Sequence, residues 1–436
     1  MVYGAGRGPR DRGARPSTSA GRAGRVSLVS LRPGDERGRG QSEAASLGRP
    51  NDDRPGPQSR GVLRPTDTAG PVWIEVDPAA IQRNLRAIRR FVGSRVKILG
   101  VVKANAYGHG LVPVAQALVE AGVDLLAVAS VVEGVALRQA GASSPILVLG
   151  QLLPEEATSV VRHNLIQAIG DSQAADALSQ AASELEQPAL VHLKVDTGMG
   201  RYGIWHEEAV ALVRRLVQFP GLRMEGVFTH LSMAGQNEEA TEEQLSRFTQ
   251  VIQRLSRARL PVSLRHAANS VGLIKFPGSH WDLVRTGLLL YGCSPVKEGA
   301  LPFDLKPALT LKAKVRFLKT IPAGQTVSYG GTWTAERPTQ VATIPIGYAH
   351  GYVRALSDKA QLLIRGVRAP VIGRITMEDL MCDVTDISGV TIGDEAVLIG
   401  TQGTQTITAE ELARHARTIP YEILAGLSPA IPRCYR

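Results

Sequence analysis

From residue 97 to about residue 286, short apolar runs alternate with segments whose apolar positions repeat at helical spacing. The helical segments include residues 111–120 and 155–163. The apolar runs lie near residues 97–102, 124–129, 145–149, 166–169, 189–195, 223–229, 262–267 and 282–285. Eight strands separated by helices are the number expected of a (β/α)8 barrel. The pattern therefore predicts an α/β fold built on a TIM-type barrel.

The pattern on either side of this region predicts a second domain. Residues 73–76 alternate like a strand, and Asp77-Pro78 is typical of a helix start, here for a helix through Phe91. After about residue 306 the rhythm becomes β, with one helix near 409–415; the strand-like runs are 309–315, 340–344, 360–364 and 395–399. We expect a disordered tail over 1–70, a barrel over 71–306 and a mostly β C-terminal domain over 307–436. We also expect the strand at Trp73 to pair with that β domain.

The net charge of +10 changes this picture little, because much of it lies in the tail. Residues 1–68 hold thirteen Arg, no Lys and seven acidic residues, which amounts to +6. This segment is rich in Gly, Pro and Ser and has too few apolar residues to form a core. The segment lacks a clear amphipathic helix, so an upstream extension without a role or an over-long translated start is favoured over an organelle presequence. Nucleic-acid binding through the tail is a distant alternative.

The rest of the composition fits a cytoplasmic globular protein with no membrane span. Hydrophobic residues make up 44% of the chain and charged residues 21%. No apolar run reaches the ~18 residues that a span requires. Cys293, Cys382 and Cys434 are widely spaced, so they predict neither a metal site nor a disulfide framework.

Lys103 is the first candidate for chemistry. It follows the apolar run 96–102 and precedes a Gly-rich turn, Tyr107-Gly108-His109-Gly110. Barrels place their reactive groups at the C-terminal ends of strands, and apolar neighbours lower the pKa of an amine. A Schiff-base lysine needs such a partly desolvated amine of lowered pKa. A lone lysine here would more often be a solvated turn residue, but the surrounding motif favours chemistry.

Polar residues also follow four later strands. Gly198 and Gly200 let the backbone project Arg201, whose guanidinium suits a carboxylate or phenolate. His230 follows the sixth strand. Asn269 and Ser270 follow the seventh, as small polar groups able to bind a phosphate, and Arg285, Gly287 and Leu288 end the eighth. Singly, His230 would be a core histidine, Arg285 an ion pair and Asn269-Ser270 a cap, but their joint occurrence indicates a site.

These residues resemble the alanine racemases, pyridoxal phosphate enzymes of fold type III, over roughly residues 72–436. The run Val-Lys-Ala-Asn-Ala-Tyr-Gly-His-Gly at 102–110 is similar to the family's cofactor signature. The resemblance implies that Lys103 carries pyridoxal 5'-phosphate covalently. The positions that match the family's phosphate ligands are Tyr107, Ser270, Gly287, Leu288 and Tyr421.

By the same resemblance, Arg285 faces the pyridine nitrogen of the cofactor. A guanidinium stays charged up to about pH 12, so it does not give the ring a proton. The neutral ring withdraws electrons less strongly, which favours return of a proton to Cα over transamination.

The resemblance also implies two bases, one for each face of the substrate Cα. Lys103 is the first, and Tyr329, in Val327-Ser328-Tyr329-Gly330-Gly331, is the second. His230 and Arg285 would stabilise the phenolate through a hydrogen-bonded chain. Tyr329 and the substrate contact Met377 would come from the partner of a head-to-tail homodimer with shared active sites. Arg201 would bind the substrate carboxylate or the cofactor phenolate, positioned by Lys194, a position that is often carbamylated.

The chain departs from the family pattern at three positions. Glu378 stands where the family usually has Asp, His350 stands where an Asp is common, beside the entrance residue Tyr348, and Ala430 replaces a usual Arg. These changes bear on substrate preference and dimer contacts more than on reaction type.

We therefore expect two-base racemisation of L- and D-alanine that supplies D-alanine for peptidoglycan. A racemase of broader specificity, acting on serine or other amino acids, is the closest alternative. A non-catalytic pyridoxal phosphate-binding barrel would lack the β domain and Tyr329. A fold-type III decarboxylase would carry a late catalytic cysteine, whereas Cys382 lies in a strand-like context typical of a core.

Overall fold

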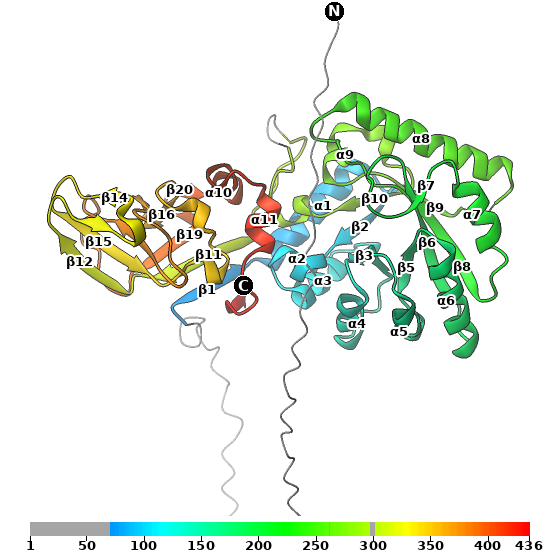
Figure 1. Ribbon diagram of the computed structural model, residues 1–436, viewed down its shortest axis with the longest axis horizontal. Helices are drawn as coiled ribbons and strands as arrows, with labels where there is room; N and C mark the ends of the chain where they lie inside the picture. The colour runs from blue at the N-terminus through cyan, green and yellow to red at the C-terminus, as the bar shows by residue number, and fades with distance from the viewer. Residues whose placement is uncertain (1–69, 261, 297–300) are drawn as a thin grey trace, which may run out of the picture. The chain divides into compact units, whose positions relative to one another are not determined.

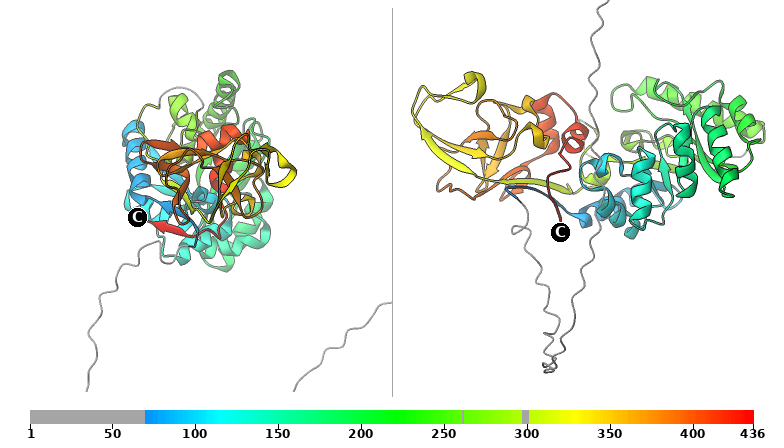
Figure 2. Two further views of the ribbon diagram at one scale, coloured as in Figure 1. Left: turned by 90° about the vertical axis from the view of Figure 1, so that its left-hand side faces the viewer. Right: turned by 60° about the horizontal axis from the view of Figure 1, so that its bottom comes forward.

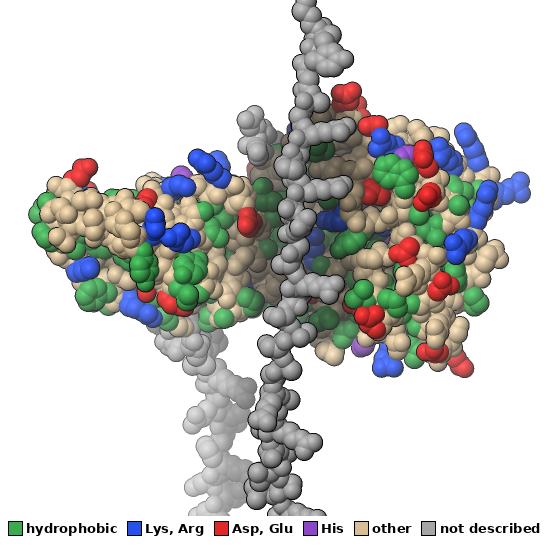
Figure 3. Space-filling model, in the orientation of Figure 1, with side chains coloured by type: hydrophobic (Ala, Val, Ile, Leu, Met, Phe, Trp, Pro, Cys, Tyr) green, Lys and Arg blue, Asp and Glu red, His purple; other side chains and the backbone are tan. Residues whose placement is uncertain are grey.

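The computed structural model describes residues 70–260, 262–296 and 301–436. The expected disordered tail falls, except for Gly70, outside these residues, and the expected domain limits stay predictions. Among the described residues, none of the helices has the length and hydropathy needed to cross a membrane. On the face drawn in Figure 3, acidic and basic side chains are interspersed, as on an ordinary mixed-charge surface.

The predicted barrel is confirmed, with strand bounds within two residues of those expected. Its parallel strands follow the order β10-β2-β3-β4-β5-β6-β8-β9. They are β2 (Lys97–Val101), β3 (Leu125–Val128), β4 (Ile146–Val148), β5 (Ile166–Ile169), β6 (Ala189–Asp196), β8 (Leu222–Phe228), β9 (Leu264–His266) and β10 (Leu283–Thr286). Two backbone hydrogen bonds join the last two strands, from Asp282 N–H to the Arg265 carbonyl (3.1 Å) and from Arg285 N–H to the Ala268 carbonyl (3.0 Å). These bonds bring the barrel close to full closure.

Helices lie outside the strands (Figures 1 and 2). They are α1 (Pro78–Val92), α3 (Leu111–Glu120), α4 (Val131–Gln139), α5 (Ala157–Arg162), α6 (Ser172–Glu184), α7 (Ala209–Leu216), α8 (Glu238–Arg257) and α9 (Ser270–Lys275). A short strand, β7 (Ile204–Trp205), pairs with β6. The expected helix start is confirmed, because Asp77 Oδ1 accepts the Ala80 N–H (2.8 Å) at the start of α1.

The C-terminal region is mostly β, as expected. One sheet has the order β17-β16-β19-β11-β1-β21, with β20 on β19, and another has the order β12-β15-β18. The strands are β11 (Leu309–Lys314), β12 (Phe317–Ile321), β13 (Thr326–Val327), β14 (Trp333–Thr334), β15 (Thr339–Ile344), β16 (Gln361–Ile364), β17 (Val367–Pro370), β18 (Leu380–Asp383), β19 (Glu395–Gln402), β20 (Gln405–Ile407) and β21 (Arg433–Tyr435). The expectation of a single helix was wrong. A second helix, α11 (Pro420–Ala425), follows α10 (Ala409–Ala416), and its six residues are too few for a periodic signal.

The first strand, β1 (Val72–Val76), belongs to this C-terminal sheet, which confirms the expected pairing. It runs antiparallel to β11, with Ile74 opposite Leu311, and parallel to β21, with Ile74 opposite Arg433. β1 leads directly into α1, so the strand ties the start of the barrel to the β sheet.

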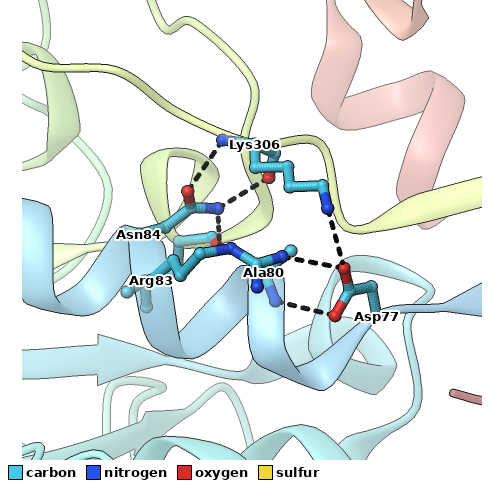
Figure 4. Close-up of polar contacts among 6 residues, drawn as sticks. Asp77, Ala80, Arg83, Asn84 and Lys306 are labelled. Carbon is cyan, nitrogen blue, oxygen red and sulfur yellow. Dashed lines mark hydrogen bonds and ion pairs between the residues drawn. The ribbon is translucent and has the colours of Figure 1, made fainter.

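A buried asparagine of α1 fixes the segment that leads from the barrel into β11 (Figure 4). Asn84 Nδ2 donates to the carbonyls of Lys306 (2.8 Å) and Leu290 (3.0 Å). Its Oδ1 accepts the Lys306 N–H (2.8 Å), so the side chain is fully satisfied. The ammonium of Lys306 lies 3.4 Å from the Asp77 carboxylate.

Replacing Asn84 should cost considerable stability. Asn84→Ala removes three hydrogen bonds and leaves buried backbone groups unpaired, so we expect a loss of about 2–4 kcal/mol in the free energy of unfolding. Urea denaturation followed by circular dichroism measures this. The control is Arg86→Ala, an exposed position of the same helix, which should change stability by no more than about 0.5 kcal/mol. Equal effects of the two variants would contradict the assigned role of Asn84.

Candidate active site

Lys103 lies directly after β2, at the start of a turn of unusual handedness. Ala104, Asn105, Ala106 and Tyr107 all have φ between 52° and 54°, in the left-handed region. This conformation costs L-residues roughly 1–2 kcal/mol each and persists only where the surroundings enforce it. The predicted turn before a helix is confirmed, since α3 begins at Leu111, but its left-handed form was not predicted.

Two side chains of the barrel domain accept hydrogen bonds from backbone N–H groups in and around this turn. The Glu133 carboxylate accepts the Ala104 N–H (2.7 Å) and, through its other oxygen, the Ala129 N–H (2.8 Å). The Asn105 amide oxygen accepts the Leu111 N–H (2.9 Å), which joins the turn to α3. These bonds supply partners for backbone groups that a left-handed segment would otherwise leave free.

The C-terminal segment holds the other end of the turn. Arg433 Nε donates to the Gly108 carbonyl (2.9 Å), and the Tyr435 hydroxyl donates to the His109 carbonyl (3.1 Å). Gly108 has φ +81°, and a Cβ there would lie 2.2 Å from the Leu424 carbonyl oxygen. Only glycine therefore allows α11 to pack against the turn.

The amine of Lys103 lies in a partly buried, cationic environment. Burial lowers its pKa, and the charges of Arg201 and Arg285 lower it further, whereas Glu133 opposes them. Burial and the same two arginines lower the pKa of Lys194 to about 8. The barrel mouth thus gathers several cations, an environment suited to an anionic ligand.

Arg285, on β10, is held by neutral acceptors through both of its terminal nitrogens. Its guanidinium contacts the carbonyls of Thr229 (2.8 Å) and Ala267 (3.0 Å) and the Nδ1 atoms of His266 (3.1 Å) and His230 (3.3 Å). Burial lowers the pKa of Arg285 to about 9, which still leaves it charged at neutral pH. Burial, reinforced by Arg285, holds the pKa of His230 well below its usual value, so His230 is a neutral acceptor.

Behind Arg285, a second histidine extends this buried arrangement. His266 Nε2 lies 2.9 Å from His192 Nδ1, and burial lowers the pKa of both rings. Because neither ring is charged, Arg285 is the one cation of this Arg285–His266–His192 cluster.

Polar groups from four separate segments, those of Tyr107, Ser270, Gly287 and Tyr421, form a candidate phosphate cradle. The Gly287 N–H donates to Ser270 Oγ (3.0 Å), and a Cβ on Gly287 would lie 2.4 Å from the Tyr107 hydroxyl oxygen. The rings of Tyr107 and Tyr421 lie 5.8 Å apart, and burial raises the pKa of Tyr421 to about 12, so both phenols remain hydrogen-bond donors. Leu288 follows in a buried 3-10 turn, Leu288–Tyr291. The absence of a Cβ at Gly287 lets the Tyr107 hydroxyl approach, and the resulting set of hydroxyl and N–H donors fits the phosphate of pyridoxal phosphate.

Asn269 organises the loop between β9 and α9. Its Oδ1 accepts the N–H groups of Val271 (3.2 Å) and Gly272 (2.9 Å), and its Nδ2 donates to the Leu231 carbonyl (3.1 Å). Because its polar atoms already have partners, a direct contact between Asn269 and a cofactor stays a prediction.

Arg201 stands on a loop shaped by a carboxylate. Asp196, at the end of β6, accepts the N–H groups of Gly198, Met199 and Gly200, all at 2.8 Å. Lys194 and Arg201 both lie against the ring of Tyr202, at 5.0 and 5.8 Å from its centroid. This arrangement places Lys194 and Arg201 together, as expected.

Within one chain, Tyr329 and Met377, the two site residues expected from the β domain, lie at the surface and are not bonded to Lys103. Tyr329 is 70% exposed and Met377 55% exposed. No hydrogen bond or ion pair between described residues links either of them to Lys103. Their exposure leaves both side chains available to a second copy of the chain.

Sequence reasoning missed Glu133 and His192. The spacing Ser130-x-x-Glu133 is a capping-box signal, and the Glu133 N–H does donate to Ser130 Oγ (3.3 Å). The Glu133 carboxylate instead reaches the Lys103 turn, which the spacing does not reveal. His192 occupies an inward position of β6, and sequence alone cannot distinguish it from a satisfied core histidine.

Comparison with known proteins yields one consistent match. The family models "Alanine racemase, N-terminal domain" and "Alanine racemase, C-terminal domain" match residues 76–295 and 308–435. The alanine racemases of Symbiobacterium thermophilum and Halothermothrix orenii are 47% and 44% identical over 370 and 367 residues. These alignments cover 85% and 84% of this chain and 98% and 97% of the relatives. The crystal structure of alanine racemase from Bacillus anthracis with bound L-Ala-P has a TM-score of 0.79 and 35% identity, covering 84% of this chain and 95% of that one.

Removing the charge of Glu133 should lower the pKa of Lys103 further. Glu133→Gln keeps the size of the side chain and removes the one carboxylate that raises this pKa. We expect Lys103 of the cofactor-free protein to be acylated at lower pH than in the unchanged protein. Peptide mass spectrometry across a pH series measures this, with Glu155→Gln, an exposed barrel position, as the control. An unchanged or higher acylation midpoint would refute the electrostatic role of Glu133.

Proposed function

Because the chain belongs to the alanine racemase family, we propose that it interconverts L- and D-alanine with pyridoxal phosphate bound through Lys103. The observation that carries this proposal is the convergence of the Lys103 turn with the Tyr107–Ser270–Gly287 cradle. The D-alanine would serve peptidoglycan synthesis, in the cytoplasm.

Each end of the cofactor has a matching group in this proposal. Tyr107, Ser270, Gly287, Leu288 and Tyr421 would hold the phosphate, and Asn269 would keep the loop of Ser270 in place. Arg285 faces the ring nitrogen, with its charge retained and its remaining N–H groups held by carbonyls and neutral histidines. When bound, the cofactor withdraws electrons from the substrate and makes the Cα proton acidic. Because Arg285 keeps its own proton, it gives none to the ring, and electron withdrawal stays moderate.

Two groups of the protein move the Cα proton. Lys103, whose pKa burial lowers, serves one face of the substrate. Tyr329 of the partner subunit serves the other face, which is consistent with its 70% exposure in a single chain. A homodimer therefore completes each active site. Met377 of the partner subunit contacts the substrate.

Arg201 binds the substrate carboxylate or the cofactor phenolate, and Lys194 positions it. Carbamylation of Lys194 requires a neutral amine. The lowering of its pKa to about 8 supports the modification, since a fraction of the amine is then neutral at physiological pH.

Two variants test the assignment of the bases. Lys103→Ala should abolish both the cofactor absorbance band that borohydride removes and racemisation, whereas Lys97→Ala, at the exposed start of β2, should keep both. Tyr329→Phe should keep the band and slow proton exchange from L-alanine by about 10²–10⁴-fold. Chiral chromatography and exchange in deuterated water measure these effects. Normal conversion of L-alanine by Tyr329→Phe would refute the second base.

The charge of Arg285 should control reaction specificity. Arg285→Glu places a carboxyl group opposite the ring nitrogen, which then keeps a proton and withdraws electrons more strongly. We expect more transamination, detected as pyruvate formed per racemisation event. A pyruvate yield equal to that of the unchanged protein would contradict this role.

A further inference from the structure

Two loops that carry residues expected at the substrate entrance pack directly together. Tyr348 and Ala349 donate their N–H groups to the carbonyls of Thr376 (3.1 Å) and Met377 (3.0 Å). A Cβ on Gly347 would lie 2.3 Å from the Thr376 carbonyl oxygen. The backbone contact is therefore close, and the position of one loop determines that of the other.

A side-chain pair, His350 and Glu378, completes this contact. His350 Nε2 lies 3.6 Å from a carboxylate oxygen of Glu378. The other ring nitrogen, Nδ1, accepts the Gly347 N–H (3.2 Å), so the neutral ring carries its proton on Nε2. The imidazole thus directs its Nε2 N–H toward the carboxylate.

His350 also fixes the Tyr348 loop to the segment after α11. Its carbonyl accepts the Ser428 N–H (3.1 Å), seven residues beyond Tyr421. The ring of His350 is largely buried, whereas the carboxylate of Glu378 is exposed. His350 is therefore the fixed member of the pair and Glu378 the one that follows it.

These two residues are also two of the three departures from the family pattern. Acidic side chains at both positions would repel each other, whereas here an imidazole faces a carboxylate across the loop contact. The extra methylene of Glu378 extends its carboxylate toward the ring.

We propose that His350 and Glu378 act as a positioning pair that holds the Met377 loop and thereby limits the size of the substrate side chain. This inference rests on the proposed function, in which Met377 contacts the substrate of the partner's active site. Met377 directly precedes Glu378, and its unbranched side chain adapts easily to the space available. A loosened loop would let Met377 withdraw and admit serine more readily beside alanine.

The test compares serine with alanine in variants of the holoenzyme. Glu378→Ala removes one partner of the pair. His350→Asn keeps an acceptor for the Gly347 N–H and no longer reaches Glu378. We expect each to raise the ratio of kcat/KM for serine to that for alanine by about two- to fivefold, the size of effect that a partly exposed polar contact allows. The change should lie mainly in KM.

Three controls separate positioning from general destabilisation. The double variant should show the same ratio as either single variant, because each substitution removes the same contact between residues 350 and 378. In His350→Gln, the amide nitrogen can take the place of the imidazole Nε2. This variant should therefore keep the serine-to-alanine ratio of the protein without substitutions. Asp386→Ala breaks the exposed ion pair with Arg337, which belongs to neither loop, and should leave the ratio unchanged.

An unchanged ratio in the single variants, or a double variant equal to the product of both effects, would overturn the pairing. If the protein without substitutions fails to racemise alanine, the proposed function is overturned instead. The two failures are therefore distinguishable.

Discussion

The site depends on the left-handed turn that follows β2. Four consecutive non-glycine residues with positive φ are unfavourable by themselves. Glu133, Asn105 and the close packing of Gly108 against α11 offset this cost. The turn fixes Lys103 at the strand end and, through Tyr107, places a phenol beside Gly287. One strained segment therefore determines both the amine and part of the phosphate cradle.

A second constraint is the buried cation at Arg285. Its contacts are carbonyls and neutral imidazoles rather than carboxylates, so its charge is not cancelled by an ion pair. Together with Arg201 and Lys194, it lowers the pKa of neighbouring groups and favours anions at the barrel mouth. The buried charge of Arg285 lowers the stability of the fold, but the same charge favours binding of an anionic cofactor and substrate.

Much of this arrangement could be predicted from sequence, because buried parallel strands are apolar runs. The run before Lys103 located both β2 and the reactive end of the strand. The left-handed form of the turn could not be predicted, since none of Ala104, Asn105 and Ala106 is a glycine that would indicate positive φ. Helix α11 was too short to give a periodic pattern, although the sequence did single out Tyr421. The hydrogen bond from the Ala104 N–H to Glu133 joins two neighbouring strand–helix units of the barrel. The pattern of residues along the chain does not show which side chains meet across such units.

The role of Lys103 can be measured directly. Reduction of the purified holoenzyme with borohydride, digestion and peptide mass spectrometry would locate the covalent cofactor. The account predicts one pyridoxyl-phosphate adduct, on the peptide that contains Lys103, in close to one copy per chain. An adduct on another lysine, or none in protein that racemises alanine, would contradict it.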